Sequence, residues 1–215
     1  MPSSPAPARR GRGWVAPVVA LAVAGILAVV LVAGGGSDDG GSSADPEETS
    51  TTAAPAPVQI ESDSPTYATL DELLAATDLV VRARVTSTER GRVFGEPGEE
   101  TALESRLVAL EVTEVLRGPE PPTEFLVEEE GWLLDGSPLI VDGLVPSAEG
   151  DDAIWFLVDP SADTQEPTPF VTVNAQGRYL VVDDTLVGAD GTDPLVGELA
   201  ALGPTGLEDA IRAAP

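Results

Sequence analysis

The chain has 215 residues, a formal net charge of −26 at pH 7, and neither cysteine nor histidine. This composition excludes disulfides, cysteine or histidine metal sites, the acylated cysteine of a lipoprotein and the Ser-His-acid triad. All 37 acidic residues follow Arg12, and so negative a surface repels phosphate backbones, so we expect no nucleic-acid partner.

The N-terminal region has the composition of a membrane anchor. Residues 14–33 carry no charge, and at about 1.5 Å per residue they span the roughly 30 Å hydrocarbon core of a bilayer. Three arginines lie within residues 1–13, so the positive-inside rule places this tail in the cytoplasm and the remainder outside it. The alternative is a secretory signal cleaved near Gly35. The apolar stretch exceeds the roughly 7 to 15 residues of a signal, which favours an uncleaved single-pass helix.

Residues 34–66 consist mainly of Gly, Ser, Thr, Pro and acidic residues, with little to bury. They predict a disordered acidic linker with a root-mean-square reach of about 30 Å. The folded extracytoplasmic domain is therefore expected over residues 67–215.

The domain opens with a helix and a strand. Thr69 and Glu72 have capping-box spacing ahead of a short helix that ends near Thr77. Residues 79–86 alternate as a strand, with the odd-numbered residues on one face and Arg82 and Arg84 on the other. We expect these arginines to pair with cross-strand glutamates. Residues 91–102 form a Gly-rich acidic loop.

Further strands follow. Residues 107–116 and 124–129 predict an antiparallel pair with a bulge at Val115 and Leu116. Residues 154–158 are apolar on both faces, as expected of a central strand. Shorter segments complete the pattern: strands over 170–173, 178–182 and 185–187, a hairpin turn at 176–177, and C-terminal helices over 195–202 and 205–212, the second with a capping box at Thr205 and Glu208.

Three motifs occur in a recognisable order: DLVVRARVT at residues 78–86, EVTEVLRG at 111–118 and GDDAIWFL at 150–157. Together they resemble the OB-like barrel of netrin and metalloproteinase-inhibitor modules over roughly residues 75–185. The resemblance implies a small OB-like antiparallel β-barrel with short flanking helices, and a mainly β fold. In the inhibitor family a cysteine at the mature N-terminus chelates zinc. This chain has no cysteine, so the resemblance implies a fold and at most a protein-binding habit.

Carboxylates beside an aromatic residue form one candidate site. Glu128 and Glu130 are expected to project on the same side of a strand, close to Trp132. Paired carboxylates serve acid/base hydrolysis, for example of envelope glycan, and an aromatic ring beside acids binds sugars or cations. The alternatives are an exposed strand end for the glutamates and ordinary packing for the tryptophan.

Aspartates near the C-terminus form a second candidate. Asp183, Asp184 and Asp190, together with Asp193, carry oxygen ligands of the type that calcium prefers. Their spacing matches no EF-hand loop, and turn formation is the alternative interpretation.

The sequence therefore predicts a membrane-anchored, non-enzymatic extracytoplasmic binding or interaction module that requires no cofactor. Its expected partner, beyond the membrane, is an envelope protein. A calcium-responsive structural domain and a carboxylate-dependent glycan hydrolase remain the alternatives.

Overall fold

The computed structural model describes residues 55–96, 102–161, 168–189 and 192–215. The predicted cytoplasmic tail (1–13), membrane helix (14–33) and most of the linker lie outside these ranges. Within the described ranges, no helix is long and apolar enough to cross a membrane.

Strands dominate the described residues, which confirms the prediction of a mainly β fold. The elements are, in chain order, β1 (Val58–Ile60), α1 (Leu70–Ala75), β2 (Leu79–Phe94), β3 (Leu103–Arg117), β4 (Glu124–Leu133), β5 (Leu139–Val141), β6 (Asp152–Val158), β7 (Phe170–Thr172), the 3-10 helix η1 (Ala175–Gly177), β8 (Arg178–Val182), β9 (Thr185–Val187), α3 (Pro194–Ala201) and α4 (Gly203–Ala213).

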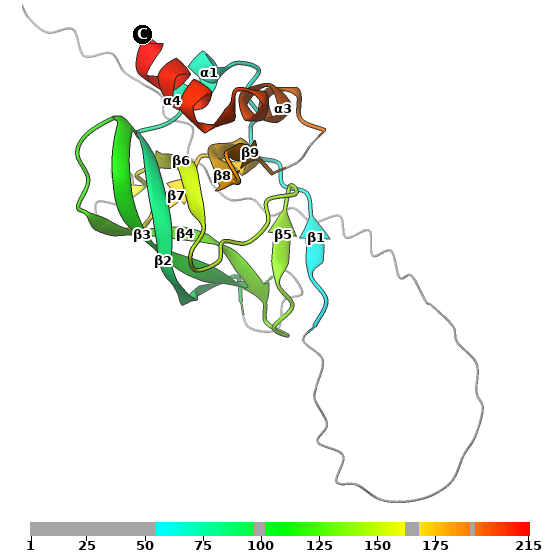
Figure 1. The fold of residues 1–215 in the computed structure, drawn as a ribbon. Helices are drawn as coiled ribbons and strands as arrows, with labels where there is room; N and C mark the ends of the chain where they lie inside the picture. Colours follow the sequence, from blue (N-terminus) through cyan, green and yellow to red (C-terminus); the bar gives the residue numbers. More distant parts are fainter. Residues whose placement is uncertain (1–54, 97–101, 162–167, 190–191) are drawn as a thin grey trace, which may run out of the picture.

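Five strands close into a ring (Figure 1). Their order is β2-β3-β4-β7-β6, and β6 returns to pair with β2 over Leu79 opposite Leu157 through Arg84 opposite Asp152. The β4–β7 pairing is parallel, and the other pairings in the ring are antiparallel. β8 and β9 continue outward from β6, while β1 and β5 form a separate parallel pair.

The ring encloses an inner core. Its buried side chains come from β2, β3, β4 and β6, and they are Leu79, Val81, Ala83, Val85, Val108, Leu110, Val127, Ala153, Trp155 and Leu157. All four residues predicted for the apolar face of residues 79–86 are among them. Phe125 and Phe170 add an edge-to-face contact with ring centroids 5.1 Å apart.

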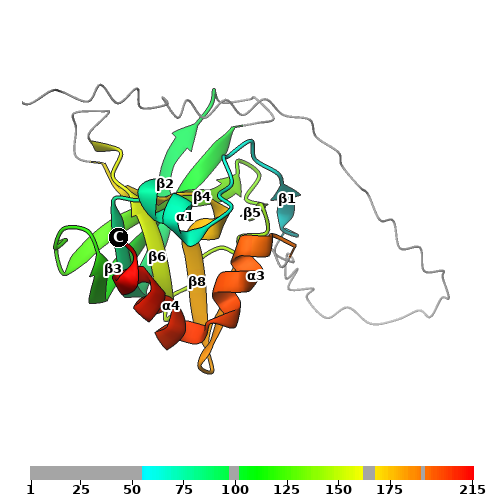
Figure 2. The same ribbon diagram turned by 90° about the horizontal axis from the view of Figure 1, so that it is seen from above.

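An outer core lies between the ring and the helices. Figure 2 shows α1, α3 and α4 on one side of the molecule, over β6 and β8. The helices contribute Leu73, Leu199 and Ile211 among other buried residues. β6 supplies both cores, with Trp155 inward and Phe156 outward, as predicted for a strand that is apolar on both faces.

One polar group in the outer core has no partner. Tyr179 is fully buried, and its hydroxyl makes no hydrogen bond. A buried hydroxyl without a partner destabilises the folded state, so Tyr179→Phe is expected to raise the free energy of unfolding by about 1 kcal/mol. Urea unfolding measures the change. Tyr67→Phe, at a half-buried ring, is the control with little expected effect. A loss of stability in Tyr179→Phe would show that the hydroxyl is satisfied.

Of the two capping boxes predicted from the sequence, the first is confirmed and the second is not. The Thr69 hydroxyl accepts from the Glu72 backbone N–H at 3.2 Å, which confirms the cap of α1, and Asp193 caps α3. The capping box expected at Thr205 is wrong. α4 already begins at Gly203 and has no side-chain cap, because Pro204 starts the helix earlier.

The hairpin turn predicted at Gln176 and Gly177 is also wrong. These residues form η1, and the strands on either side of it pair with β6 rather than with each other. The tight hairpin of this region instead joins β8 to β9 through Asp183 and Asp184.

The strands extend further than their patterns predicted. β2 reaches Phe94, so the loop expected over residues 91–102 is shorter, and the bulge at Val115 and Leu116 is present. The linker predicted over residues 34–66 ends earlier than expected, since β1 pairs with β5. Composition could not reveal this pairing, because the partner strand lies about 80 residues away.

Candidate functional site

The carboxylate and aromatic residues singled out in the sequence have internal partners. Glu128 is buried and receives two hydrogen bonds from Arg92, at 2.8 and 3.0 Å. Two guanidinium groups contact the Trp132 ring, with Arg90 at 4.7 Å and Arg106 at 4.3 Å from its centroid. Because these cations occupy the ring, Trp132 offers little surface to an external ligand.

Glu130 is half-buried beside other acids. Burial raises the pKa of its carboxyl, and the charges of Glu129, Asp142 and Glu128 raise it further. The unfolded chain therefore releases the Glu130 proton at a lower pH than the folded state does. Stability falls as pH rises from the pKa of the unfolded chain to the raised pKa of the folded state, and it stays reduced at neutral pH.

The variant Glu130→Gln removes this pH-dependent penalty. It is expected to melt at a higher temperature than the unmodified chain at pH 7, and the difference is expected to vanish below pH 4.5, the ordinary pKa of this carboxyl. Thermal unfolding at both pH values measures it. Glu124→Gln, at an exposed position on the same strand, is the matched control. An equal shift in both variants would contradict the prediction.

The aspartates singled out as calcium ligands include a turn pair. Asp183 and Asp184 have φ of 47° and 61° and connect β8 to β9, the backbone pattern of a type I′ hairpin. Asp190 lies outside the described residues. In the part of the chain that the structure describes, no three acidic side chains group closely enough to hold a metal ion.

A buried ion pair that the sequence patterns did not reveal lies against the inner core, where the Arg178 guanidinium is 5.4 Å from the centroid of the Trp155 ring. Arg178 donates to Glu129 at 2.7 Å, and the two side chains are 1% and 5% exposed. Ser147 donates its hydroxyl to the same carboxylate at 2.8 Å, and Arg178 also donates to the Val145 carbonyl. The pair therefore fixes the loop between β5 and β6 against the ring.

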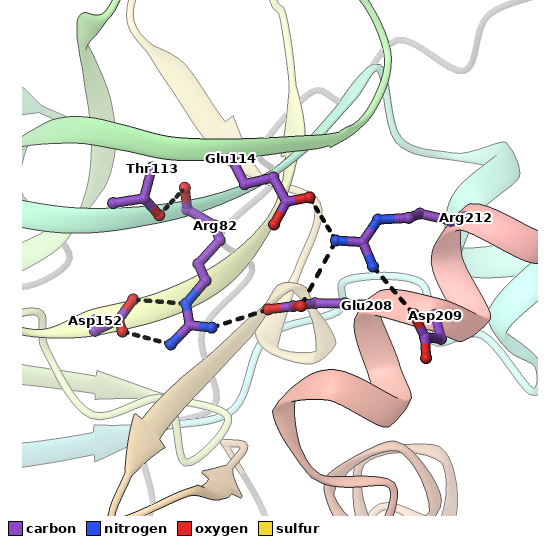
Figure 3. A network of polar contacts seen from close by, with 7 residues as sticks. All are labelled: Arg82, Thr113, Glu114, Asp152, Glu208, Asp209 and Arg212. Carbon is purple, nitrogen blue, oxygen red and sulfur yellow. Dashed lines mark hydrogen bonds and ion pairs between the residues drawn. The ribbon is translucent and has the colours of Figure 1, made fainter.

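A second charged network fastens α4 to the strands (Figure 3). Arg82 donates two hydrogen bonds to Asp152 on β6, at 2.8 and 3.2 Å, and one to Glu208 on α4 at 3.0 Å. Arg212 connects Glu208 to Glu114 on β3. Cross-strand pairing of Arg82 is thus observed, with an aspartate where a glutamate was expected. Since the guanidinium groups are neutralised within the network, it fits a structural role.

A cleft of about 260 Å³ is the better candidate for a site. It lies where four segments meet, and its lining residues are Ser62, Ser64, Thr66, Asp142, Asn174, Ala175, Gln176, Ala189, Thr192, Asp193 and Val196. The first three belong to residues 58–66, which we call the strap. The cleft is thus built from the strap, the end of β5, η1 and the start of α3.

Hydrogen bonds hold the polar groups of the cleft in place. Gln176 is buried and donates to Asp193 at 2.9 Å, while its carbonyl oxygen accepts from the Tyr67 backbone N–H at 2.8 Å. Asn174 donates to the Pro65 carbonyl at 2.7 Å. Asp142, at φ 48°, accepts from the Ser62 backbone N–H at 2.7 Å and from its hydroxyl. The polar lining is therefore preorganised.

The charge of the cleft limits what it binds. Its described lining holds hydroxyl and amide groups and two carboxylates, Asp142 and Asp193, and none of these residues is basic. An anion would meet repulsion, whereas a small neutral or cationic molecule with hydrogen-bonding groups would not. The volume lies just below the roughly 300 to 1,000 Å³ of drug-sized pockets, which fits a small ligand.

No protein-family model matches the sequence, and no curated protein matches it significantly.

Proposed function

We propose that the chain is a membrane-anchored, non-enzymatic binding module outside the cytoplasm, with the cleft as its binding site for a small polar molecule. The observation that carries this proposal is the preorganised, acid-lined cleft beside the ring. Its lining groups are hydrogen-bond donors and acceptors of fixed direction, the feature that gives ligand sites their specificity.

The fold we propose is an OB-like barrel. The closed ring of five strands supports it, since a small five-stranded barrel is the outline of that fold. The proposed non-enzymatic role is supported by the pairing of Glu128 with Arg92, because both oxygens of this carboxylate already accept hydrogen bonds from the guanidinium. An envelope component is the partner class that the proposed location favours.

Binding is tested by thermal unfolding of the full chain in detergent micelles with three millimolar probe sets: amino acids, neutral monosaccharides and aliphatic diamines. We expect at least one neutral or cationic probe to raise the melting temperature. Ser64→Trp, which fills the cleft from an exposed position, should abolish the rise. Thr86→Trp, exposed on β2 away from the cleft, should retain it. A shift that survives Ser64→Trp, or no shift with any probe, would refute the proposal.

The membrane topology is tested separately in intact cells. Because the chain lacks cysteine, Ser3→Cys and Ser64→Cys each introduce a single thiol. A membrane-impermeant maleimide should label the second variant in intact cells and the first only after permeabilisation. If the mature chain of Ser3→Cys lacks its thiol, a signal has been cleaved, and labelling of Ser3→Cys in intact cells would reverse the topology.

A further inference from the structure

The strap forms one wall of the cleft through a short series of hydrogen bonds. Val58 donates its backbone N–H to the Pro138 carbonyl at 2.8 Å, and Asp142 donates its own to the Ile60 carbonyl at 2.9 Å. The Ser62 contacts to the Asp142 carboxylate come next along the strap, and the Asn174 bond to the Pro65 carbonyl follows. Each contact is made within a few residues of the next.

The strap contributes to neither hydrophobic core. None of residues 58–66 belongs to the inner or the outer core, and Tyr67 is the first residue of the described chain that packs against the helices. Most strap residues are exposed. Detachment of the strap therefore breaks a few hydrogen bonds but leaves both cores intact, which is typical of segments that open locally well below the global unfolding free energy.

The strap also contains β1, the first element of the described chain. We infer that the strap is a gate at the side of the cleft, with the Ser62–Asp142 contact as its latch. This inference rests on the proposed function, because it describes the regulation of the same cleft. Because the contacts follow one another along the strap, a separation that begins at β1 reaches the latch next, and the cleft opens while the domain stays folded.

A thiol placed behind the strap reports the opening. Val196 belongs to the outer core, also lines the cleft and is 4% exposed. The single cysteine of Val196→Cys is therefore shielded, and loss of the strap wall should expose it from the cleft side. Adding Ser62→Ala removes the hydroxyl half of the latch. The rate at which a small maleimide labels this thiol in the full chain is then expected to rise about 5- to 10-fold, the change that corresponds to one hydrogen bond.

The control variant removes a serine–aspartate contact that is confined to a local turn elsewhere. Ser161 donates its backbone N–H and its hydroxyl to Asp159, as Ser62 does to Asp142, but it lies outside the cleft. Adding Ser161→Ala to Val196→Cys should leave the labelling rate unchanged. Equal rates in all three chains, or an equal rise in both serine variants, would overturn the gate. Because labelling uses no ligand, this result is independent of the probe-binding test of the proposed function.

A second measurement covers the case in which Val196→Cys does not fold. The unmodified full chain is held by its two ends in a single-molecule force experiment. Release of the nine strap residues should give a first extension of up to about 30 Å at a force below that of global unfolding. Ser62→Ala should lower the force of this first step and leave the second unchanged. Unfolding in a single step, with no early extension, would overturn the inference.

Discussion

Gly118→Ala is expected to lower the free energy of unfolding by about 3 to 5 kcal/mol. Gly118 has φ +101°, where a side chain strains the backbone by about 1 to 3 kcal/mol. A Cβ there would also lie 2.5 Å from the Asp78 carbonyl oxygen and 3.1 Å from the Leu79 Cα. Asp78 cannot move away freely, because its backbone N–H donates to the Leu157 carbonyl at the closure of the ring. Urea unfolding followed by tryptophan fluorescence measures the loss.

Gly136→Ala is the matched control for this prediction. Gly136 has a similar φ of +90°, but a Cβ at this position would meet nothing within 4 Å. It should therefore show only the backbone strain, about 1 to 3 kcal/mol. The difference between the two variants isolates the clash with Asp78. Equal losses would show that the closure of the ring yields to the added methyl group.

The second large loss of stability is expected at the buried ion pair between Arg178 and Glu129. Glu129→Gln leaves the Arg178 guanidinium buried without its counter-charge, and the loss of one partner of such a pair typically costs about 3 to 5 kcal/mol. Glu114→Gln is the control, because Glu114 contacts Arg212 at the surface, where a single pair contributes under about 1 kcal/mol. Urea unfolding of both variants distinguishes the two environments.

A double variant tests whether the uncompensated charge of Arg178 causes this loss. Glu129→Leu combined with Arg178→Met removes both charges and keeps the volume apolar, so it should be more stable than Glu129→Gln alone. A double variant that is as unstable as the single one would indicate that the loop contacts of Arg178, such as its bond to the Val145 carbonyl, matter more than the charge.

The parts of the fold that sequence predicted well are those governed by local periodicity. The alternation in residues 79–86 placed Val81, Ala83 and Val85 inward because a strand has a period of two, and burial enforces that register. The same alternation along β4 would have identified Glu129 as an inward-facing residue. It lies two residues after Val127, so the strand turns it inward, whereas Glu128 and Glu130 project from the opposite face.

The cleft could not be predicted in the same way. Its walls come from segments around Ser62, Asp142, Gln176 and Asp193, which are far apart in sequence and meet only because the ring and the helices bring them together. Each of these residues looks like an ordinary turn or cap residue on its own. Only the three-dimensional arrangement shows that Gln176 is buried and that the strap is held beside it.

The position of β6 bears on how fast the chain folds. β6 pairs with β2, β7 and β8, and its partners on β2 lie roughly 70 residues earlier in the chain. Closure of so long a loop is entropically unfavourable until many contacts form together, and topologies of this kind fold in milliseconds to seconds. Until β6 is in place, the β2–β3–β4 meander exposes the apolar face of an open sheet. During this interval aggregation or proteolysis competes with folding, and the heavy negative charge keeps neighbouring chains apart.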